Sequence, residues 1–257
     1  MVYKKVIHGF DLPNESLSRD YDLVSEYDTA WRSWLQTEGK TFKHSIPTNG
    51  IIESIEKICS SNEYKRFVII QDEVEFYSLI LRYYSKNFTV IKAGDWNRLQ
   101  EDDLICLSMP FSFNGSIPDW YQDLCNYIKD KNIYMFLDGA YLGTINKKLY
   151  IPNNCILFAT SVSKCFNASS LRAGILFYDK LPTLFKPKSL IANYNYTSMK
   201  KAIELLNKYD YYYMHQTYWH IQKLICSTYQ LQPADSVILG YNETRHCIPY
   251  LYQNLNC

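Results

Sequence analysis

Short apolar runs alternate with amphipathic segments between residues 50 and 178, and this alternation restricts the possible folds more than any other feature of the sequence. The apolar runs have the length and composition of buried strands, and the segments between them have the periodicity of helices. The expected strands are Arg66–Gln71, Phe88–Ile91, Leu104–Met109, Ile133–Leu137, Cys155–Ala159 and Gly174–Tyr178, and the expected helices are Ile51–Ser60, Val74–Tyr84 and Pro118–Lys129. This order predicts an α/β fold in which a mostly parallel sheet is covered by helices on both faces, giving three α/β/α layers.

The segments on either side of this region have a different pattern. The first 45 residues are mixed and polar, with one expected helix over Asp22–Gln36. Near the other end, Ser198–Tyr229 is expected to be one long helix with a candidate break at Tyr209–Met214, followed by a strand at Ser236–Leu239 and a helix over Glu243–Asn254. We therefore expect an N-terminal arm and helix in residues 1–45, a large α/β domain in residues 46–185, and a small, abbreviated α+β domain in residues 186–257.

Composition excludes several classes of function. The net charge is +1 and no block of Lys or Arg stands out, which argues against a nucleic-acid or anionic-membrane partner. The eight cysteines form no Cys-x-x-Cys pair and the five histidines are scattered, so no metal site is expected and the cysteines are interpreted as buried free thiols. The first residues lack the apolar core of a signal peptide, and no apolar run approaches the roughly 18 residues of a membrane span. The expected location is the cytoplasm.

Two polar loops that follow expected strands could bind an anion and present a nucleophile. The sequence Ser-Val-Ser-Lys at residues 161–164 comes just after the strand Cys155–Ala159 and offers two hydroxyls and an amine. Arg172, eight residues after Lys164, could direct its forked guanidinium onto the same anion, such as a phosphate. Taken singly, a serine followed by a lysine is more often only an exposed surface pair.

Two further loops fit the same ligand. Asp138 ends the strand Ile133–Leu137, and a carboxylate there needs a cation to offset its desolvation; the phenol of Tyr141 follows three residues later. Gly50 precedes the helix that starts at Ile51, so the backbone can approach an anion and the free N–H groups of the helix can bind it. The alternatives are an ordinary turn or cap at Asp138 and an ordinary helix start at Gly50.

Together these four loops resemble the fold-type I pyridoxal-phosphate (PLP) enzymes, and among them the histidinol-phosphate type of aminotransferase. The resemblance covers roughly residues 48–178, with the motifs in the family's order. It implies that Lys164 forms the Schiff base with the cofactor and moves the proton at the substrate Cα, that Asp138 keeps the pyridine nitrogen charged, and that Tyr141 bonds the ring hydroxyl. It implies that the phosphate is bound by Ser161, Ser163, Arg172, Gly50 and the N–H groups of Ile51 and Ile52.

The resemblance also implies roles for side chains at less certain positions. Phe76 is the first choice for the aromatic residue that stacks on the ring, with Tyr77 second. Tyr21 is the candidate for a tyrosine that one subunit of a homodimer lends to the phosphate of the other. Ser112 occupies the place of the family's asparagine beside the ring hydroxyl, and Asn114 could reach in instead if the loop is rearranged.

The largest departure from the family lies near the end of the chain. Relatives carry an arginine there that clamps the substrate carboxylate, whereas Arg245 is the only arginine after Arg172 and lies on the wrong element to match. The sequence therefore predicts a PLP-dependent enzyme acting on a small amino acid or amine, most simply an aminotransferase. The alternatives are a PLP-dependent decarboxylase or lyase, for which losing a carboxylate clamp is natural, and a non-catalytic homologue that serves as a binding or scaffold protein.

Overall fold

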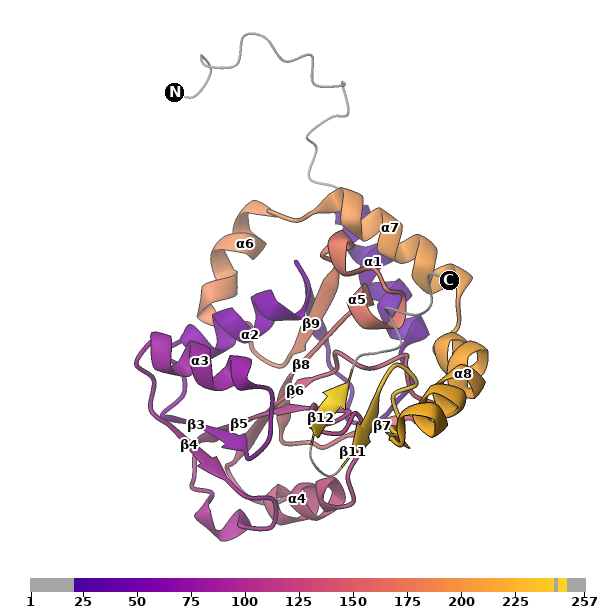
Figure 1. The fold of residues 1–257 in the computed structure, drawn as a ribbon. Helices are drawn as coiled ribbons and strands as arrows, with labels where there is room; N and C mark the ends of the chain where they lie inside the picture. Colours follow the sequence, from indigo (N-terminus) through magenta and orange to yellow (C-terminus); the bar gives the residue numbers. More distant parts are fainter. Residues whose placement is uncertain (1–20, 243–244, 249–257) are drawn as a thin grey trace.

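A seven-stranded sheet forms the centre of the molecule (Figure 1). The computed structural model describes residues 21–242 and 245–248. The strand order is β2-β9-β8-β6-β5-β3-β4, and all neighbours are parallel except β9, which runs antiparallel to both β2 and β8. The strands are β2 His44–Thr48, β3 Arg66–Ile70, β4 Phe88–Ile91, β5 Asp103–Ser108, β6 Tyr134–Asp138, β8 Cys155–Ser161 and β9 Gly174–Tyr178.

Helices cover both faces of this sheet, as the sequence predicted. Helices α2 (Ile51–Ser60) and α3 (Glu75–Tyr83) pack on one face, and α1 (Tyr21–Trp34), α4 (Trp120–Ile128) and α7 (Tyr196–Lys208) pack on the other. Successive residues of β3 point to opposite faces, so that Phe67 and Ile69 join the core under α2 and α3 while Val68 and Ile70 join the opposite core. Nearly every position of the central strands is therefore apolar, which is why they were visible in the sequence.

The remaining elements are short, apart from α8. A two-stranded parallel pair joins β1 and β7, and a three-stranded antiparallel sheet has the order β10-β11-β12. These elements are β1 Thr37–Gly39, η1 Trp96–Arg98, β7 Leu149–Ile151, α5 Val162–Cys165, η2 Ser169–Leu171, η3 Thr183–Phe185, α6 Lys186–Ile191, α8 Tyr213–Tyr229, β10 Gln232–Pro233, β11 Gly240–Asn242 and β12 Arg245–Ile248. The long C-terminal helix is broken where the sequence suggested, between α7 and α8.

Strand β2 was not expected from the sequence. It contains Pro47, which cannot donate a backbone hydrogen bond and so argues against a central strand. The structure places β2 at the edge of the sheet, where only β9 is paired with it. A proline is tolerated at such an edge, because one side of the strand needs no donors.

Two expectations for the C-terminal segment were wrong. Arg245–Ile248, predicted to be helical, is strand β12 and pairs with β11; the rest of Glu243–Asn254 lies outside the described residues. Ser236–Leu239, predicted to be a strand, is a turn between β10 and β11. The buried side-chain amide of Gln222 on α8 donates to three backbone carbonyls of residues 234–239, at 2.7–3.0 Å. This long-range contact, which local sequence does not reveal, supplies hydrogen-bond partners that a strand would otherwise provide.

The turn at residues 234–239 is also tied to the loops that follow β5 and β6. The backbone N–H of Ser236 donates to the carbonyl of Gly115 at 2.8 Å, and that of Val237 donates to the carbonyl of Thr144 at 2.8 Å. The buried hydroxyls of Thr144 and Ser236 lie 2.8 Å apart. The C-terminal segment is thus fixed directly to the end of the sheet that carries the predicted site.

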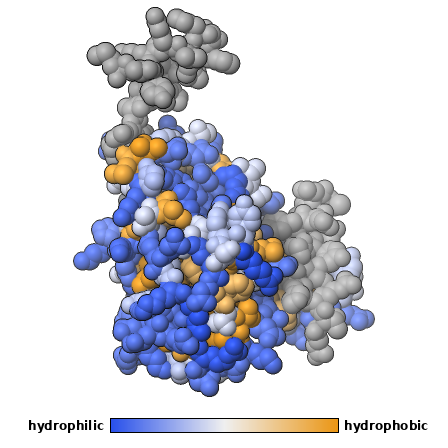
Figure 2. All heavy atoms as spheres, turned by 90° about the vertical axis from the view of Figure 1, so that its left-hand side faces the viewer, coloured by the Kyte–Doolittle hydropathy of each residue, from blue (hydrophilic) through white to orange (hydrophobic). Residues whose placement is uncertain are grey.

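Apolar side chains are also exposed on the side of the molecule formed by α2, α3 and α6. Figure 2 shows them as separate patches among hydrophilic surface rather than as one continuous area. Ile52 on α2, Leu79 on α3 and Leu190 on α6 are examples of large side chains that are about half or more exposed. Single exposed apolar residues of this kind are normal on protein surfaces and indicate no partner by themselves.

Candidate active site

The register of the sheet brings the predicted loops to one edge. The paired residues near this edge are Thr48 with Gly174, Gly174 with Ser161, Ala159 with Asp138, and Asp138 with Ser108. The loop before α2, the start of β9, and the loops after β8, β6 and β5 therefore meet at the carboxyl ends of the parallel strands. Ligands of open α/β sheets bind at this edge.

The first part of the site is the start of α2. Gly50 has φ +83° and ψ 178°, a conformation that essentially only glycine adopts, and it precedes the first turn of the helix. The Arg172 guanidinium donates to the Asn49 carbonyl at 2.9 Å, and a Cβ at Gly50 would lie only 3.2 Å from Arg172 Nη2. Glycine thus keeps the space between this guanidinium and the unpaired N–H groups of the helix open, which suits an anion.

A buried hydroxyl beside Gly50 supports this interpretation. Thr48 Oγ1 is inaccessible to solvent and has no hydrogen-bond partner among the residues that the structure describes. It lies next to Gly174, where a Cβ would be 2.9 Å from both Thr48 Oγ1 and Gly50 Cα. A buried hydroxyl without a partner is costly, and a ligand oxygen at this corner would supply one.

Lys164 lies on the short helix α5, directly after β8. The helix begins after the buried residue Ser161, and both Ser163 and Lys164 are half-buried. The Lys164 Nζ lies 5.8 Å from the centroid of the Tyr141 ring. The structure therefore brings together the predicted amine and the predicted phenol, although they are far apart in the sequence.

Asp138 is buried at the end of β6, and its neighbours act in opposite directions on the ionisation of its carboxyl. Its carboxylate accepts hydrogen bonds from the Ala140 N–H at 2.8 Å and from the Tyr77 hydroxyl at 3.2 Å. Burial raises the pKa of Asp138 to about 7 and the charge of Glu73 adds to the rise, while the Ala140 and Tyr77 hydrogen bonds and the charge of Lys164 oppose it. A buried carboxyl of this kind is suited to pairing with a cationic ring nitrogen.

Glu73 is a buried acid at the same edge that the sequence analysis did not single out. Its carboxylate accepts hydrogen bonds from the Ser108 N–H and hydroxyl, both at 2.7 Å, from the Val74 N–H at 2.8 Å, and from the Ser112 hydroxyl. Burial raises the pKa of Glu73, and the hydrogen bonds from Ser112 and Ser108 oppose that rise. The sequence gives one signal, an acid just after a buried strand, but nothing local pairs it with serines 35 and 39 positions away.

The structure locates the remaining predicted residues as follows. Ile51 and Ile52 are the first two residues of α2, where their N–H groups were expected. Phe76 packs, partly buried, against the hydrophobic core under α2 and α3, and the second choice, Tyr77, is the aromatic residue bonded to Asp138. Ser112 is engaged with Glu73. The backbone of Tyr21 opens α1, but its side chain lies outside the described residues.

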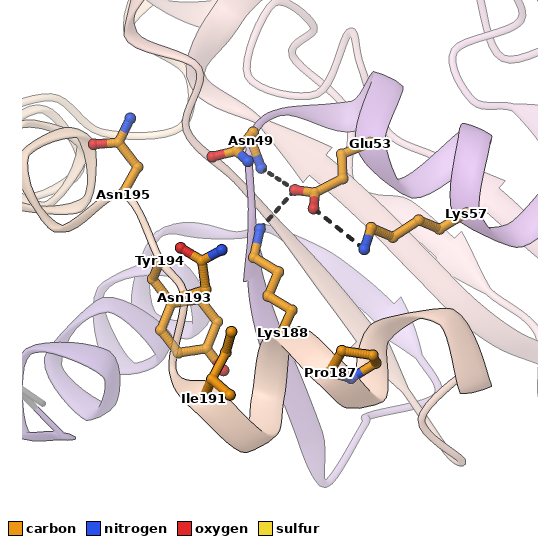
Figure 3. Close-up of a pocket in the computed structure, with 9 residues that line it drawn as sticks. All are labelled: Asn49, Glu53, Lys57, Pro187, Lys188, Ile191, Asn193, Tyr194 and Asn195. Atoms are coloured by element: carbon orange, nitrogen blue, oxygen red, sulfur yellow. Dashed lines mark hydrogen bonds and ion pairs between the residues drawn. The ribbon is translucent and has the colours of Figure 1, made fainter. Parts of the chain in front are cut away.

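A cavity of about 340 Å³ lies beside the start of α2, between that helix and the segment formed by α6 and the residues after it (Figure 3). Within it, Glu53 accepts a hydrogen bond from the Asn49 N–H at 2.6 Å and pairs with Lys188 at 2.7 Å. Lys188 is buried, which lowers its pKa despite the opposing effect of Glu53. Asn49, whose carbonyl accepts the hydrogen bond from Arg172, lines this cavity, whereas Gly50, Arg172, Asp138 and Lys164 do not.

Residues 21–242 and 245–248 contain no group of three side chains placed to hold a metal ion. No helix within these residues is long and apolar enough to cross a bilayer.

Comparison with known proteins identifies the fold. No protein-family model matches the sequence, and no curated protein matches it. Among solved structures, an aspartate aminotransferase from Rhizobium meliloti matches with a TM-score of 0.67 and 14% identity over 84% of this chain and 64% of that chain. A PLP-bound C-S lyase from Staphylococcus hominis matches with a TM-score of 0.62 and 14% identity over 84% and 66%.

A third solved structure, an L-threonine-O-3-phosphate decarboxylase from Porphyromonas gingivalis, has a TM-score of 0.60 and 14% identity over 80% of this chain and 65% of that chain. The chain thus has the fold of the fold-type I PLP-dependent enzymes. It covers less than two thirds of the length of each of these three proteins. They catalyse different reactions, so the shared fold does not select among transfer, elimination and decarboxylation.

Proposed function

We propose that this chain is a PLP-dependent enzyme that acts on a small amino acid or amine, most simply by transferring the amino group. The observation that carries the proposal is the convergence of Lys164, Asp138 and the Arg172–Gly50 corner on one edge of the sheet. Each of these groups is common singly, but an amine, a buried carboxyl and a helix start suited to an anion together match the aldehyde, the ring nitrogen and the phosphate of PLP.

The residues present fit that cofactor. The phosphate would be held by Arg172, the hydroxyls of Ser161 and Ser163, and the first N–H groups of α2. The Thr48 hydroxyl, which has no hydrogen-bond partner within the described part of the chain, lies beside them. The pyridine nitrogen would face Asp138. When bound, PLP acts as an electron sink that stabilises negative charge at the substrate Cα.

The chain's own residues supply the rest of the chemistry. Lys164 would hold the cofactor covalently and, once displaced by the substrate amine, carry the proton to and from the substrate Cα. Asp138 would keep a proton on the ring nitrogen, because its buried negative charge is stabilised by a neighbouring cation. Tyr141, beside Lys164, would donate to the ring hydroxyl. We also infer a homodimer, in which Tyr21 would reach the partner's phosphate.

A second candidate reaction is decarboxylation or elimination on the same cofactor. Residues 173–242 contain no arginine, and Arg245 lies on β12. A site without a bidentate carboxylate clamp suits a reaction that expels the carboxylate or a substrate that lacks one. A non-catalytic binding protein remains the third candidate, but such a protein has no use for Lys164.

Purified protein reconstituted with PLP tests the proposal. The native chain should become yellow and retain visible absorbance on dialysis, and Lys164→Ala should lose the covalent signal after borohydride reduction and mass spectrometry. Lys148→Ala, at an exposed lysine, is the matched control and should behave as the native chain does. A native protein that takes up no PLP would overturn the proposal.

The reaction is then identified by its products. Amino acids are supplied with a keto-acid acceptor, and both the new amino acid and carbon dioxide are followed. Formation of the new amino acid supports transamination, and release of carbon dioxide supports decarboxylation. Bound cofactor without turnover of any amine would favour the non-catalytic protein.

A further inference from the structure

Glu73 belongs to none of the roles assigned so far, although it is buried among residues of the candidate site. It lies in the loop between β3 and α3, and its four hydrogen-bond donors come from that loop, from the end of β5 and from the loop after β5. Four donors are enough to satisfy both oxygens of an ionised carboxylate, and two of them are backbone N–H groups whose positions are fixed.

The Glu73 carboxylate connects the loop after β3 to the end of β5 and to the loop that follows β5. Ser108 is the last residue of β5, and its hydroxyl both donates to Glu73 and accepts from the Ser112 N–H at 2.9 Å. Ser112 in turn donates its own hydroxyl to Glu73. Ser112 is the residue expected beside the ring hydroxyl of the cofactor, so the position of that side chain depends on Glu73.

Glu73 also lies close enough to Asp138 for the two charges to interact. Ser108, which holds Glu73, is paired with Asp138 across β5 and β6, and Tyr77 on α3 donates to Asp138. The negative charge of Glu73 opposes ionisation of both Asp138 and Tyr77. The other groups that act on Asp138 are Lys164 on α5, whose positive charge favours ionisation, and the N–H of Ala140.

We propose that Glu73 is a positioning residue of this site, which fixes the Ser112 loop and sets a second negative charge beside Asp138. The inference rests on the proposed function and deepens it. With Glu73 ionised, a second negative charge lies near the Asp138 carboxyl that would face the ring nitrogen, which strengthens the binding of a protonated ring. When no cation is present, the same charge favours the protonated form of Asp138.

Titration of Asp138 in the ligand-free protein tests the proposal without requiring any activity. Aspartate labelled with ¹³C at the side-chain carboxyl is incorporated, and the Asp138 signal is assigned as the one missing from Asp138→Asn. In Glu73→Gln, which keeps the shape of the side chain but removes the charge, the midpoint of the Asp138 titration should shift to lower pH. In Glu75→Gln, an exposed acid on α3, the midpoint should equal that of the native protein.

An unchanged Asp138 midpoint in Glu73→Gln would overturn the proposal, because a purely structural glutamate would change stability without moving that titration. PLP affinity provides a second measurement: Glu73→Gln should bind PLP on the order of five- to tenfold more weakly than the native chain. If the native chain binds no PLP at all, the proposed function fails, but the titration still decides whether the two carboxyls are coupled.

A second variant covers the case in which Glu73→Gln does not fold. Ser112→Ala removes one donor and leaves the charge of Glu73 in place. With ¹³C-labelled glutamate, the Glu73 titration should then move to higher pH, because the carboxylate has lost a hydrogen bond that favours its ionised form. A Glu73 midpoint that does not move would show that Ser112 does not hold the carboxylate, and would overturn the proposal.

Discussion

The two ends of the candidate site bind charge in different ways. At the α2 end, the anion-binding groups are backbone N–H groups and the exposed guanidinium of Arg172, arranged around a glycine. At the β6 end, the charged groups are the buried carboxyls of Asp138 and Glu73, which suit a cation. Backbone N–H groups do not titrate and an arginine stays charged at any physiological pH, whereas the charge of buried carboxyls changes with pH. The α2 end should therefore respond to shape and salt, and the β6 end to pH.

The largest effect is expected at the β6 end. Asp138→Asn should weaken PLP binding by at least about a hundredfold, because the ring cation loses its buried partner. Equilibrium dialysis of PLP measures this loss. If the variant binds PLP as tightly as the native chain, the β6 end is not the ring-binding end and the comparison fails.

The same variant should have the opposite effect on stability. The pKa of Asp138 is raised in the folded state to about 7, so the folded protein binds this proton more tightly than the unfolded chain does, and ionisation costs stability as pH rises from about 4 through 7. Ligand-free Asp138→Asn should thus be more stable than the native protein at about pH 8, by on the order of 2 kcal/mol. This difference in the free energy of unfolding should vanish at about pH 4.

Urea unfolding at the two pH values tests this prediction. Asp103→Asn is the control, because Asp103 is equally buried but starts β5 and pairs with Arg66 at 2.6 Å. That variant should be less stable than the native protein near about pH 8, since it leaves a cation without its partner. A stability loss in Asp138→Asn of the same size as in Asp103→Asn would contradict the assignment of Asp138.

A smaller effect is expected from the guanidinium of the α2 end. Arg172→Met should bind PLP about tenfold more weakly, because a charge-assisted contact to the phosphate is lost while the N–H groups of α2 remain. The difference between variant and native affinities should shrink at high salt, and it should not depend on pH around neutrality. Arg82→Met, at another exposed arginine, should bind PLP as the native chain does. Calorimetric titration at two salt concentrations provides the measurement.

The smallest effect on binding is expected from Gly50→Ala. The substitution forces a side chain into a backbone conformation that costs about 1–3 kcal/mol, and its Cβ would crowd the guanidinium of Arg172. Gly94→Ala is the matched control: Gly94 has φ +96°, but no atom lies within 4 Å of the added Cβ.

Both glycine variants should lose stability in urea unfolding, while only Gly50→Ala should bind PLP more weakly, by a factor of roughly three to ten. Equal PLP affinities for the two variants would show that Gly50 is needed only for its backbone conformation and not to leave space for the ligand.

Local sequence pattern decided which parts of the site were predictable at either end, since Asp138 was predicted and its neighbour Glu73 was not. Gly50, Lys164 and Arg172 stand at fixed places relative to strands and helices, and those elements have strong local patterns. Their positions could therefore be read along the chain, and the strand register brings them to the predicted edge. Glu73 could not be predicted, because its role depends on contacts with Ser108 and Ser112 that only the packed sheet creates.

The fold was predictable to a similar, uneven extent. The central strands are buried on both faces, so their sequences are short continuous apolar runs, which their length and composition mark as strands. The C-terminal segment has no such signal. Ser236–Leu239 is apolar enough for a strand, yet its backbone is held as a turn by one buried amide from Gln222. A contact of that kind leaves no trace in local composition.

The ties between the turn at residues 234–239 and the loops after β5 and β6 have a mechanical consequence. A rocking motion of this turn away from the sheet must break the buried hydrogen bonds to Gly115 and Thr144 or move those loops with it. The loop after β5 contains Ser112, and the loop after β6 contains Tyr141. In the proposed enzyme, any closure of the C-terminal segment over a ligand would therefore also move the loops that carry Ser112 and Tyr141, so substrate entry and alignment of the site would be one movement rather than two.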